Sequence, residues 1–258
     1  MKQFAARFSL FCSFSLIVCA IVGCKTSETE HSHVCTVVSV GGEARYWDGQ
    51  NNKVHVIKNG DQIPSGSTIE TAKGMGNYID LAMGKRLSTI YWNYPYVFDP
   101  GDSLRVNEDS VLKLEKVILR TVGGNRTLDA RLHLLQGSVL IRKIGTQQEA
   151  FLQAGAAAPS KGTSNWELRG SNCVVRAEGG GVWFSALGLT RVIWGTATVE
   201  RIDEKTTTHL TDGQQYDVAS GNISVMDERI RMVFILGPDF APPAKTQRPR
   251  FPIPQRPF

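Results

Sequence analysis

The chain has 258 residues, 41% of them hydrophobic, and a formal net charge of +5 at pH 7. The first 23 residues hold two basic side chains and the last 18 hold four, with no acid in either segment, so the body between them carries a charge of −1. Nucleic-acid-binding domains show clustered basic residues on their folded part, so this distribution argues against nucleic acid as a partner.

The N-terminus begins with a short basic region followed by an apolar run at residues 8–22. Its length is typical of a signal peptide and is shorter than the ~20 residues of a membrane-spanning helix. The tetrapeptide IVGC at 21–24 resembles the bacterial lipobox, in which the cysteine sulfur carries the lipid. We expect residues 1–23 to be a lipoprotein signal peptide and Cys24 to be the lipidated residue. A non-cleaved anchor and a plain secretory signal are the alternatives.

A lipid on Cys24 would anchor the protein in the bacterial cell envelope, facing the periplasm. Lys25 follows this cysteine and is compatible with sorting to the outer membrane under rules known for some bacteria. Residues 24–35 form the expected tether. Its His31, His33 and Cys35 would lie on one side of an extended segment and are residue types that bind zinc. We favour a plain polar spacer, and predict no metal site.

Export and lipidation leave two further cysteines, Cys35 and Cys173. An even pair in an oxidising compartment is a candidate disulfide, here between the first strand and the centre of the chain. Two separate buried thiols are the alternative.

The body at residues 36–226 predicts an all-β domain. Short runs rich in Val, Ile, Leu and aromatic residues alternate with Gly, Asn and Asp turns. The expected strands are Thr36–Val40, Lys53–Ile57, Asn77–Met83, Ser103–Val106, Ala130–Leu135, Val139–Ile144, Cys173–Ala177 and Val182–Leu187. Residues 44–63 and 197–216 share a strand, hairpin loop, strand and glycine-turn pattern, which favours stacked or rolled antiparallel sheets. Residues 227–240 are a closing strand or a short helix.

Several motifs occur in an order that resembles the FecR-type periplasmic domain. The segment at 60–71 matches its G-D-x-I-x-x-G-x-x-I-x-T pattern. The stretches at 78–81 and 103–114 resemble its next sheet elements, with Leu132, Gly137 and Val139 as a looser match. LRGS at 168–171 stands where the family has V-R-G-T, and GQ at 213–214 with Val218 resembles its closing element.

The resemblance covers residues 36–226 and implies a β-helix or β-roll-like module without enzymatic activity, here as a stand-alone lipoprotein. It implies structural roles for Gly60, Asp61, Arg169 and Gly170, with the arginine binding carbonyls or a carboxylate. The best-known members relay the ligand occupancy of an outer-membrane receptor to a sigma factor. Sensing or protein scaffolding, through an envelope protein partner, is therefore the implied role.

An apparent insertion relative to this family, residues 84–100, is rich in aromatic residues. The candidate binding residues there are Tyr91, Trp92, Tyr94, Tyr96 and Phe98. Four of them, all but Tyr91, would line one face of an extended strand and form a platform for a protein or a sugar. The insertion therefore makes a cell-wall or glycan-binding module the alternative function. The same rings could instead cover the core.

No nucleotide-binding loop, nucleophile elbow or paired-histidine metal motif occurs. Ser171 and Cys173 have no base nearby in the sequence, so we predict that the protein is not an enzyme and needs no cofactor. The tail at 241–258 is basic and Pro-rich, which favours an extended polyproline II conformation. A disordered end, a spacer, or an arm that meets anionic lipid or an aromatic groove are the alternatives for this segment.

Overall fold

The computed structural model describes residues 29–32, 34–51, 53–87, 97–122, 125–143 and 162–236. Within these ranges the chain is almost entirely β-structure, as expected. The elements are β1 Thr29–Ser32, β2 Val34–Gly41, β3 Ala44–Trp47, β4 Val54–Val56, β5 Gln62–Pro64, β6 Thr68–Thr71, β7 Tyr78–Leu87, β8 Val97–Val106, β9 Val111–Val122, β10 Asn125–Gln136, β11 Ser138–Lys143, β12 Gly162–Arg169, β13 Cys173–Ser185, β14 Leu189–Arg201, β15 Thr207–Thr211, β16 Gln214–Asp217, β17 Asn222–Val225 and α3 Glu228–Leu236.

Alternation of apolar and polar residues explains the longest strands. In β9, Leu112 and Leu114 are fully buried and Lys113 between them is exposed. A bulge opposite β10 then shifts the register, after which Val117 and Leu119 are buried in turn. The bulge therefore places Val117 and Leu119 on the same inner face as Leu112 and Leu114.

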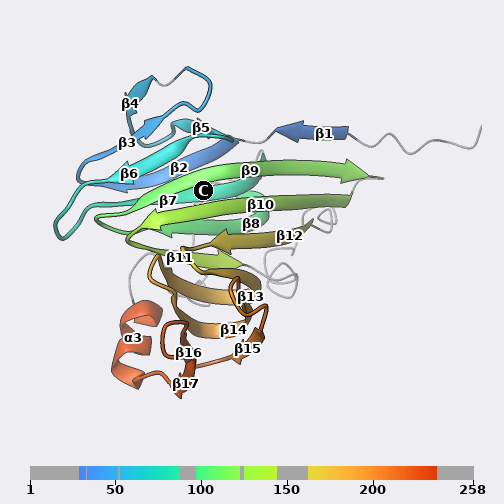
Figure 1. The fold of residues 1–258 in the computed structure, drawn as a ribbon. Coiled ribbons are helices and arrows are strands. Elements are labelled where there is room, and N and C mark those ends of the chain that lie inside the picture. Colours follow the sequence, from blue (N-terminus) through green and yellow to red (C-terminus); the bar gives the residue numbers. More distant parts are fainter. Residues whose placement is uncertain are drawn as a thin grey trace, which may run out of the picture.

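The strands form one strongly curled sheet that closes on itself (Figure 1). Through its hydrogen bonds the order is β9, β10, β12, β13, β11, β8, β7 and β2. Strand β1 leads into β2 and pairs with β9, which completes the ring. The pair of β10 with β12 is parallel, and the chain between the two strands has the length that a parallel connection requires.

One corner of the ring is built by β13, which was expected to be two strands. Its first half pairs with β12 and its second half with β11, while β14 runs along its other edge. The change occurs at Gly179, Gly180 and Gly181, beside two register shifts. The sequence prediction placed a turn at these glycines, but they instead form a bulged corner within a continuous strand.

Gly180 shows why glycine is required at this corner. It has φ of +94°, and a Cβ there would lie 2.0 Å from the carbonyl oxygen of Trp194 in β14. Its partner across the strands, Gly195, also has a positive φ of +91°. Only glycine adopts this conformation without strain, so the two strands can approach closely and turn together.

The interior is apolar, with side chains from all sides of the ring. Leu81, Leu104 and Leu132 are among those with no exposed surface. A polar contact lies among them, because the buried indole Nε1 of Trp166 donates a 2.6 Å hydrogen bond to Asp102. Burial of both partners makes this bond costly to break.

The segment expected as a strand or a helix is the helix α3. Its start is capped by Asp227, whose Oδ1 accepts the amide of Arg229 at 2.7 Å. The helix packs on the outside of the ring over a second apolar cluster formed by Leu140, Ile193 and Met226. Trp183 and Phe234 pack against this cluster, with ring centroids 6.3 Å apart.

The candidate disulfide is not formed, and the alternative of two separate buried thiols is the one observed. Cys35 and Cys173 are both free and have no exposed surface. The Cys35 sulfur lies 3.0 Å from the sulfur of Met83. Burial raises the pKa of Cys35 to about 12 and that of Cys173 to about 11.

In the described part of the chain no helix is long and apolar enough to cross a membrane. The same residues contain no cluster of three histidine, cysteine or acidic side chains that could hold a metal ion. His31 and Cys35 of the expected tether belong to strands, β1 and β2 respectively, so the sheet begins before the predicted domain boundary at residue 36.

Candidate binding groove

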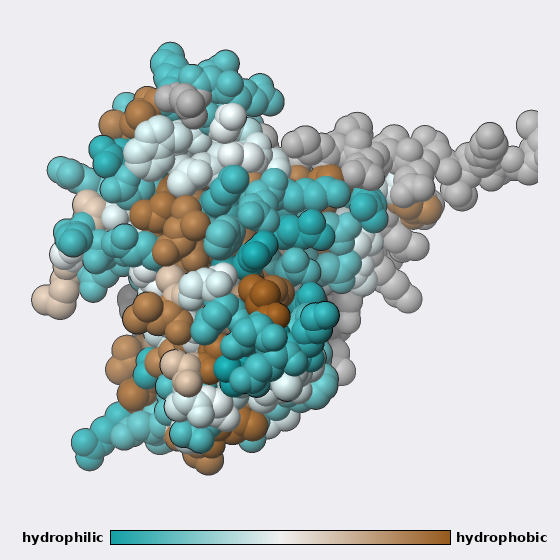
Figure 2. Space-filling view, in the orientation of Figure 1, coloured by the Kyte–Doolittle hydropathy of each residue, from teal (hydrophilic) through white to brown (hydrophobic). Residues whose placement is uncertain are grey.

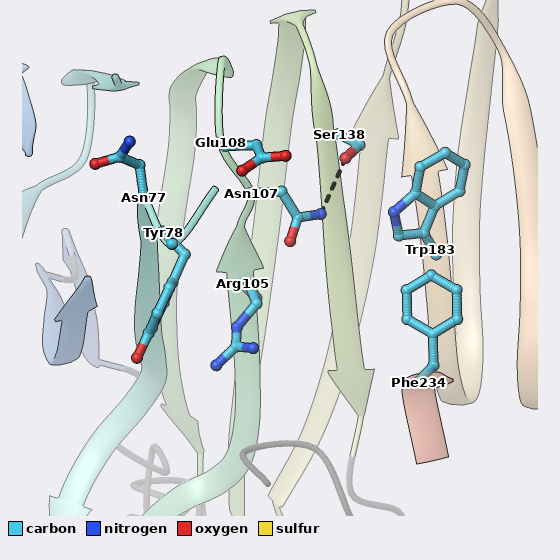
Figure 3. Close-up of a pocket in the computed structure, with 9 residues that line it drawn as sticks. Asn77, Tyr78, Arg105, Asn107, Glu108, Ser138, Trp183 and Phe234 are labelled. Atoms are coloured by element: carbon cyan, nitrogen blue, oxygen red, sulfur yellow. Dashed lines mark hydrogen bonds between the residues drawn. The ribbon is translucent and has the colours of Figure 1, made fainter. Parts of the chain in front are cut away.

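A groove of about 360 Å³ lies on the outside of the ring, between the end of α3 and strands β7 and β8 (Figure 3). Its floor crosses β8, β11 and β13. The lining residues are Gly76, Asn77, Tyr78, Arg105, Asn107, Glu108, Ser138, Trp183 and Phe234. Sites that bind ligands combine aromatic walls with a few polar groups in this way.

Strand register places two of these side chains, Arg105 and Trp183, in one row across the sheet. Asp80 in β7 lies opposite Arg105 in β8, which lies opposite Leu140 in β11. Leu140 in turn lies opposite Trp183 in β13, and Trp183 lies opposite Arg191 in β14. Because neighbouring residues in register point to the same face, the row carries the Asp80–Arg105 pair at one end, then Leu140 and Trp183, and Arg191 at the other end.

The positive charge in the groove belongs to Arg105, and the carboxylate of Asp80 neutralises it. Arg105 donates two hydrogen bonds of 2.7 Å to the two carboxylate oxygens of Asp80. The two side chains are only 17% and 13% exposed, and the guanidinium also lies 4.4 Å from the ring centre of Tyr78. Such bidentate, stacked pairs fix geometry, so Arg105 holds the Tyr78 ring in place as one wall.

Trp183 and Phe234 form the opposite wall. Trp183 is half-buried, and Arg191 lies 4.8 Å from its ring centre on the sheet. Burial lowers the pKa of Arg191 from its usual value, although its Nε donates to Gln215 at 3.1 Å. Phe234 reaches the groove from the last turn of α3, and Figure 3 shows the two rings close together.

Polar groups lie between the two walls. The side-chain amide of Asn107 donates a 2.9 Å hydrogen bond to the hydroxyl of Ser138. Because the Ser138 oxygen accepts that bond, its hydroxyl hydrogen remains able to donate to a ligand carbonyl. Glu108 is exposed at the rim and makes no ion pair with any residue that the structure describes. Among the residues that the structure describes, the lining contains no histidine, cysteine or lysine.

A second hollow, of about 320 Å³, lies on the charged outer face formed by β9, β10, β12 and β13. Its charged groups are largely paired with one another. Glu167 contacts Arg131 at 3.3 Å and Arg176 at 3.4 Å, and Asp129 contacts Arg120 at 3.4 Å. Figure 2 shows this face as mostly hydrophilic, whereas hydrophobic side chains gather at α3 and β17. The charges of this hollow therefore interact mainly with one another across the strands.

The family-hallmark residues divide into two groups. Gly60 has φ of +87° and its amide donates to the Val37 carbonyl at 2.8 Å, while the Asp61 carboxylate accepts the Lys58 amide at 2.8 Å. Gly170 is buried, with Phe184 2.7 Å from the position of a Cβ. Gly60 and Asp61 thus lie in a turn, and Gly170 packs against Phe184.

The contacts expected of Arg169 are not found among the residues that the structure describes. This residue is exposed at the end of β12, and within the described ranges its side chain makes no hydrogen bond or ion pair. Its neighbour Gly170 carries the structural constraint instead, because a side chain there would collide with the core.

The other predicted site residues lie outside what the structure describes. These are Cys24, Tyr91, Trp92, Tyr94 and Tyr96, together with the tail at 241–258. The backbone at Phe98 belongs to β8, paired with Arg86 of β7. The groove was not predicted from the sequence. The signal that could have found it is Trp183, a large aromatic residue at an outward position next to Phe184, which points inward.

No protein-family model and no curated protein matches this chain. Two crystal structures are similar, both of a protein named as a candidate anti-sigma factor from Parabacteroides distasonis. The first has 13% sequence identity and a TM-score of 0.34, and the match covers 62% of this chain and 65% of that one. The second has 12% identity and a TM-score of 0.33, with 61% and 65% covered. The match therefore spans less than two thirds of the length of those chains.

Proposed function

We propose that this protein is a non-enzymatic, lipid-anchored module of the bacterial cell envelope that serves in sensing or scaffolding by binding a protein partner. The observation that carries the proposal is the groove beside α3. Its walls are the half-buried aromatic side chains of Tyr78, Trp183 and Phe234, and its floor offers the polar groups of Asn107 and Ser138. Aromatic surface next to a few hydrogen-bonding groups is the composition of protein recognition sites.

The envelope location rests on the sequence. The lipobox-like tetrapeptide before Cys24 supports a lipid anchor, and the motif order that resembles FecR-type domains supports a periplasmic sensing role. Growth with an alkyne-tagged palmitate should label the wild-type protein and leave Cys24→Ala unlabelled and released from membranes. A protein that is labelled equally with and without this cysteine would contradict the anchor.

The partner site is tested with two charge reversals of exposed side chains. Glu108→Lys changes the groove rim, and Lys116→Glu makes the matched change on the charged face. Each full-length protein is precipitated from solubilised envelope with an antibody against the folded domain. We expect one stoichiometric protein with wild type and Lys116→Glu, and at least about tenfold less with Glu108→Lys, because rim charges set complementarity.

The glycan alternative is a distinct outcome of the same experiment. If the precipitate contains cell-wall polysaccharide instead of protein, and Trp92→Ala removes it, then the aromatic insertion is the binding site and the protein-partner proposal falls. If Lys116→Glu removes the partner while Glu108→Lys retains it, the binding site lies on the charged face.

A further inference from the structure

The C-terminal segment 241–258 has a sequence that suits an aromatic groove. It holds six prolines and four basic residues with no acid. The P-x-x-P pattern occurs twice, at 249–252 and at 254–257, and arginines stand at 248, 250 and 256. Segments of this type favour the polyproline II conformation and bind in grooves between aromatic side chains, with little entropy lost.

The groove beside α3 has the complementary groups. Proline rings pack between aromatic side chains, which Tyr78 offers on one side and Trp183 with Phe234 on the other. A polyproline II backbone has free carbonyl oxygens, which suit the hydroxyl of Ser138. The exposed carboxylate of Glu108 at the rim suits an arginine that flanks the prolines.

The segment is also attached next to the groove. Phe234, one wall residue, lies two positions before the end of α3 at Leu236. Residues 237–248 then separate the helix from the first P-x-x-P pattern. A random-coil chain of 12 residues has an end-to-end distance of about 20 Å, so a stretch of this length can return to the groove. Attachment at this range gives an effective concentration on the order of millimolar, which favours even a weak contact.

We propose that the groove beside α3 is occupied by the chain's own Pro-rich segment 241–258, which docks in a polyproline II conformation. A partner that uses the groove must displace this segment. That second statement rests on the proposed function, whereas the docking itself does not. The ligand class of the groove is therefore a proline-rich peptide that carries basic residues.

The experiment uses a fluorescently labelled peptide of residues 241–258 and measures its binding by anisotropy. The two proteins compared are the full chain and a chain that ends at Phe240, after matched thermal melts show that both are folded. We expect the peptide to bind the shortened chain at least tenfold more tightly than the full chain, because the attached segment competes. Glu108→Lys in the shortened chain should weaken binding severalfold, and Lys116→Glu should leave it unchanged.

Three outcomes would overturn the proposal. The first is equal affinity for the two chains, and the second is an affinity that Lys116→Glu lowers and Glu108→Lys does not. The third is a full chain that is dimeric by light scattering and becomes monomeric on shortening, since the segment would then occupy a second copy. A peptide that fails to bind while partner capture still depends on Glu108 refutes the docking and leaves the proposed function standing. If the peptide binds as expected but no partner is captured, the docking stands and the proposed function is refuted.

Discussion

The two outer faces of the ring differ although β13 and β14 contribute to both. The face over β9, β10 and β12 carries charged residues that pair with one another across the strands, such as Arg176 with Glu167 and Glu200. The face over β8 and β11 carries aromatic side chains, a compensated arginine and the packed helix α3. Paired surface charges keep a sheet face soluble, whereas half-buried aromatic residues leave binding surface. The bulged corner of β13 at Gly179, Gly180 and Gly181 separates the charged face from the aromatic face.

The largest effect is expected at that corner. Gly180→Ala should lower the free energy of unfolding by about 3 kcal/mol, because a positive φ and a clash with the Trp194 carbonyl act together. Gly179→Ala is the matched control, since a Cβ there meets nothing within 4 Å, and it should change stability by less than about 1 kcal/mol. Urea denaturation measures both. Equal effects would show that the corner does not constrain the fold.

A smaller difference in the free energy of unfolding is expected between ion pairs on the two faces. Asp80→Asn removes the charge of a bidentate pair whose two side chains are less than 20% exposed, and should cost about 3 kcal/mol. Glu200→Gln removes a 2.7 Å contact to Arg176, but these side chains are 39% and 45% exposed, so the cost should be below about 1 kcal/mol. Chemical denaturation of both variants tests the difference. Similar costs would mean that the two faces do not differ electrostatically.

The packing of α3 on the aromatic face is tested within the helix itself. Phe234→Ala removes a ring packed against Trp183 and the second apolar cluster, and should cost about 1–2 kcal/mol. Val233→Ala is the control, because that side chain is 72% exposed and its removal should be nearly neutral. Amide hydrogen exchange in α3 should accelerate only in the first variant. Faster exchange in both would place the stability of the helix elsewhere.

The two buried thiols in the interior of the ring make the stability of the protein depend on pH. The pKa of Cys35 is raised to about 12 and that of Cys173 to about 11, from an ordinary value of 9.0. Both thiols are therefore harder to ionise in the folded state, so their contribution is complete below pH 9 and is lost as pH rises toward 12. Stability should fall in this range by up to about 1.4 kcal/mol per pH unit for each thiol. Cys35→Ala should give a shallower fall, and an unchanged slope would contradict the assignment.

The sequence was sufficient for the fold class, because alternation such as Leu132 with Leu134 appears directly in burial of the same side chains. Alternation does not say which face is covered, however. Val54 and Val56 alternate just as clearly, but they are 49% and 71% exposed because β4 lies at the edge of the sheet. Burial depends on which strands become neighbours, and this is not a local property.

The bulged corner of β13 and the groove also depend on which strands become neighbours, so they could not be predicted from local sequence. Three glycines in succession are the usual signal of a turn, and only the different partners of the two halves of β13 make them a bend inside a strand. The groove joins Arg105, Trp183 and Phe234, which are separated by 78 and 51 positions in the sequence. Their proximity follows from strand register and from the packing of α3, so no local motif could reveal it.

The central claim is that the aromatic face binds the partner and the charged face does not. The most direct test places a photo-crosslinking amino acid at position 108 or, in a second strain, at position 116 of the full-length protein, in growing cells. Irradiation should give one discrete adduct, heavier than the monomer, from position 108 and none from position 116. An adduct from position 116 alone, or the same adduct from both, would contradict the account.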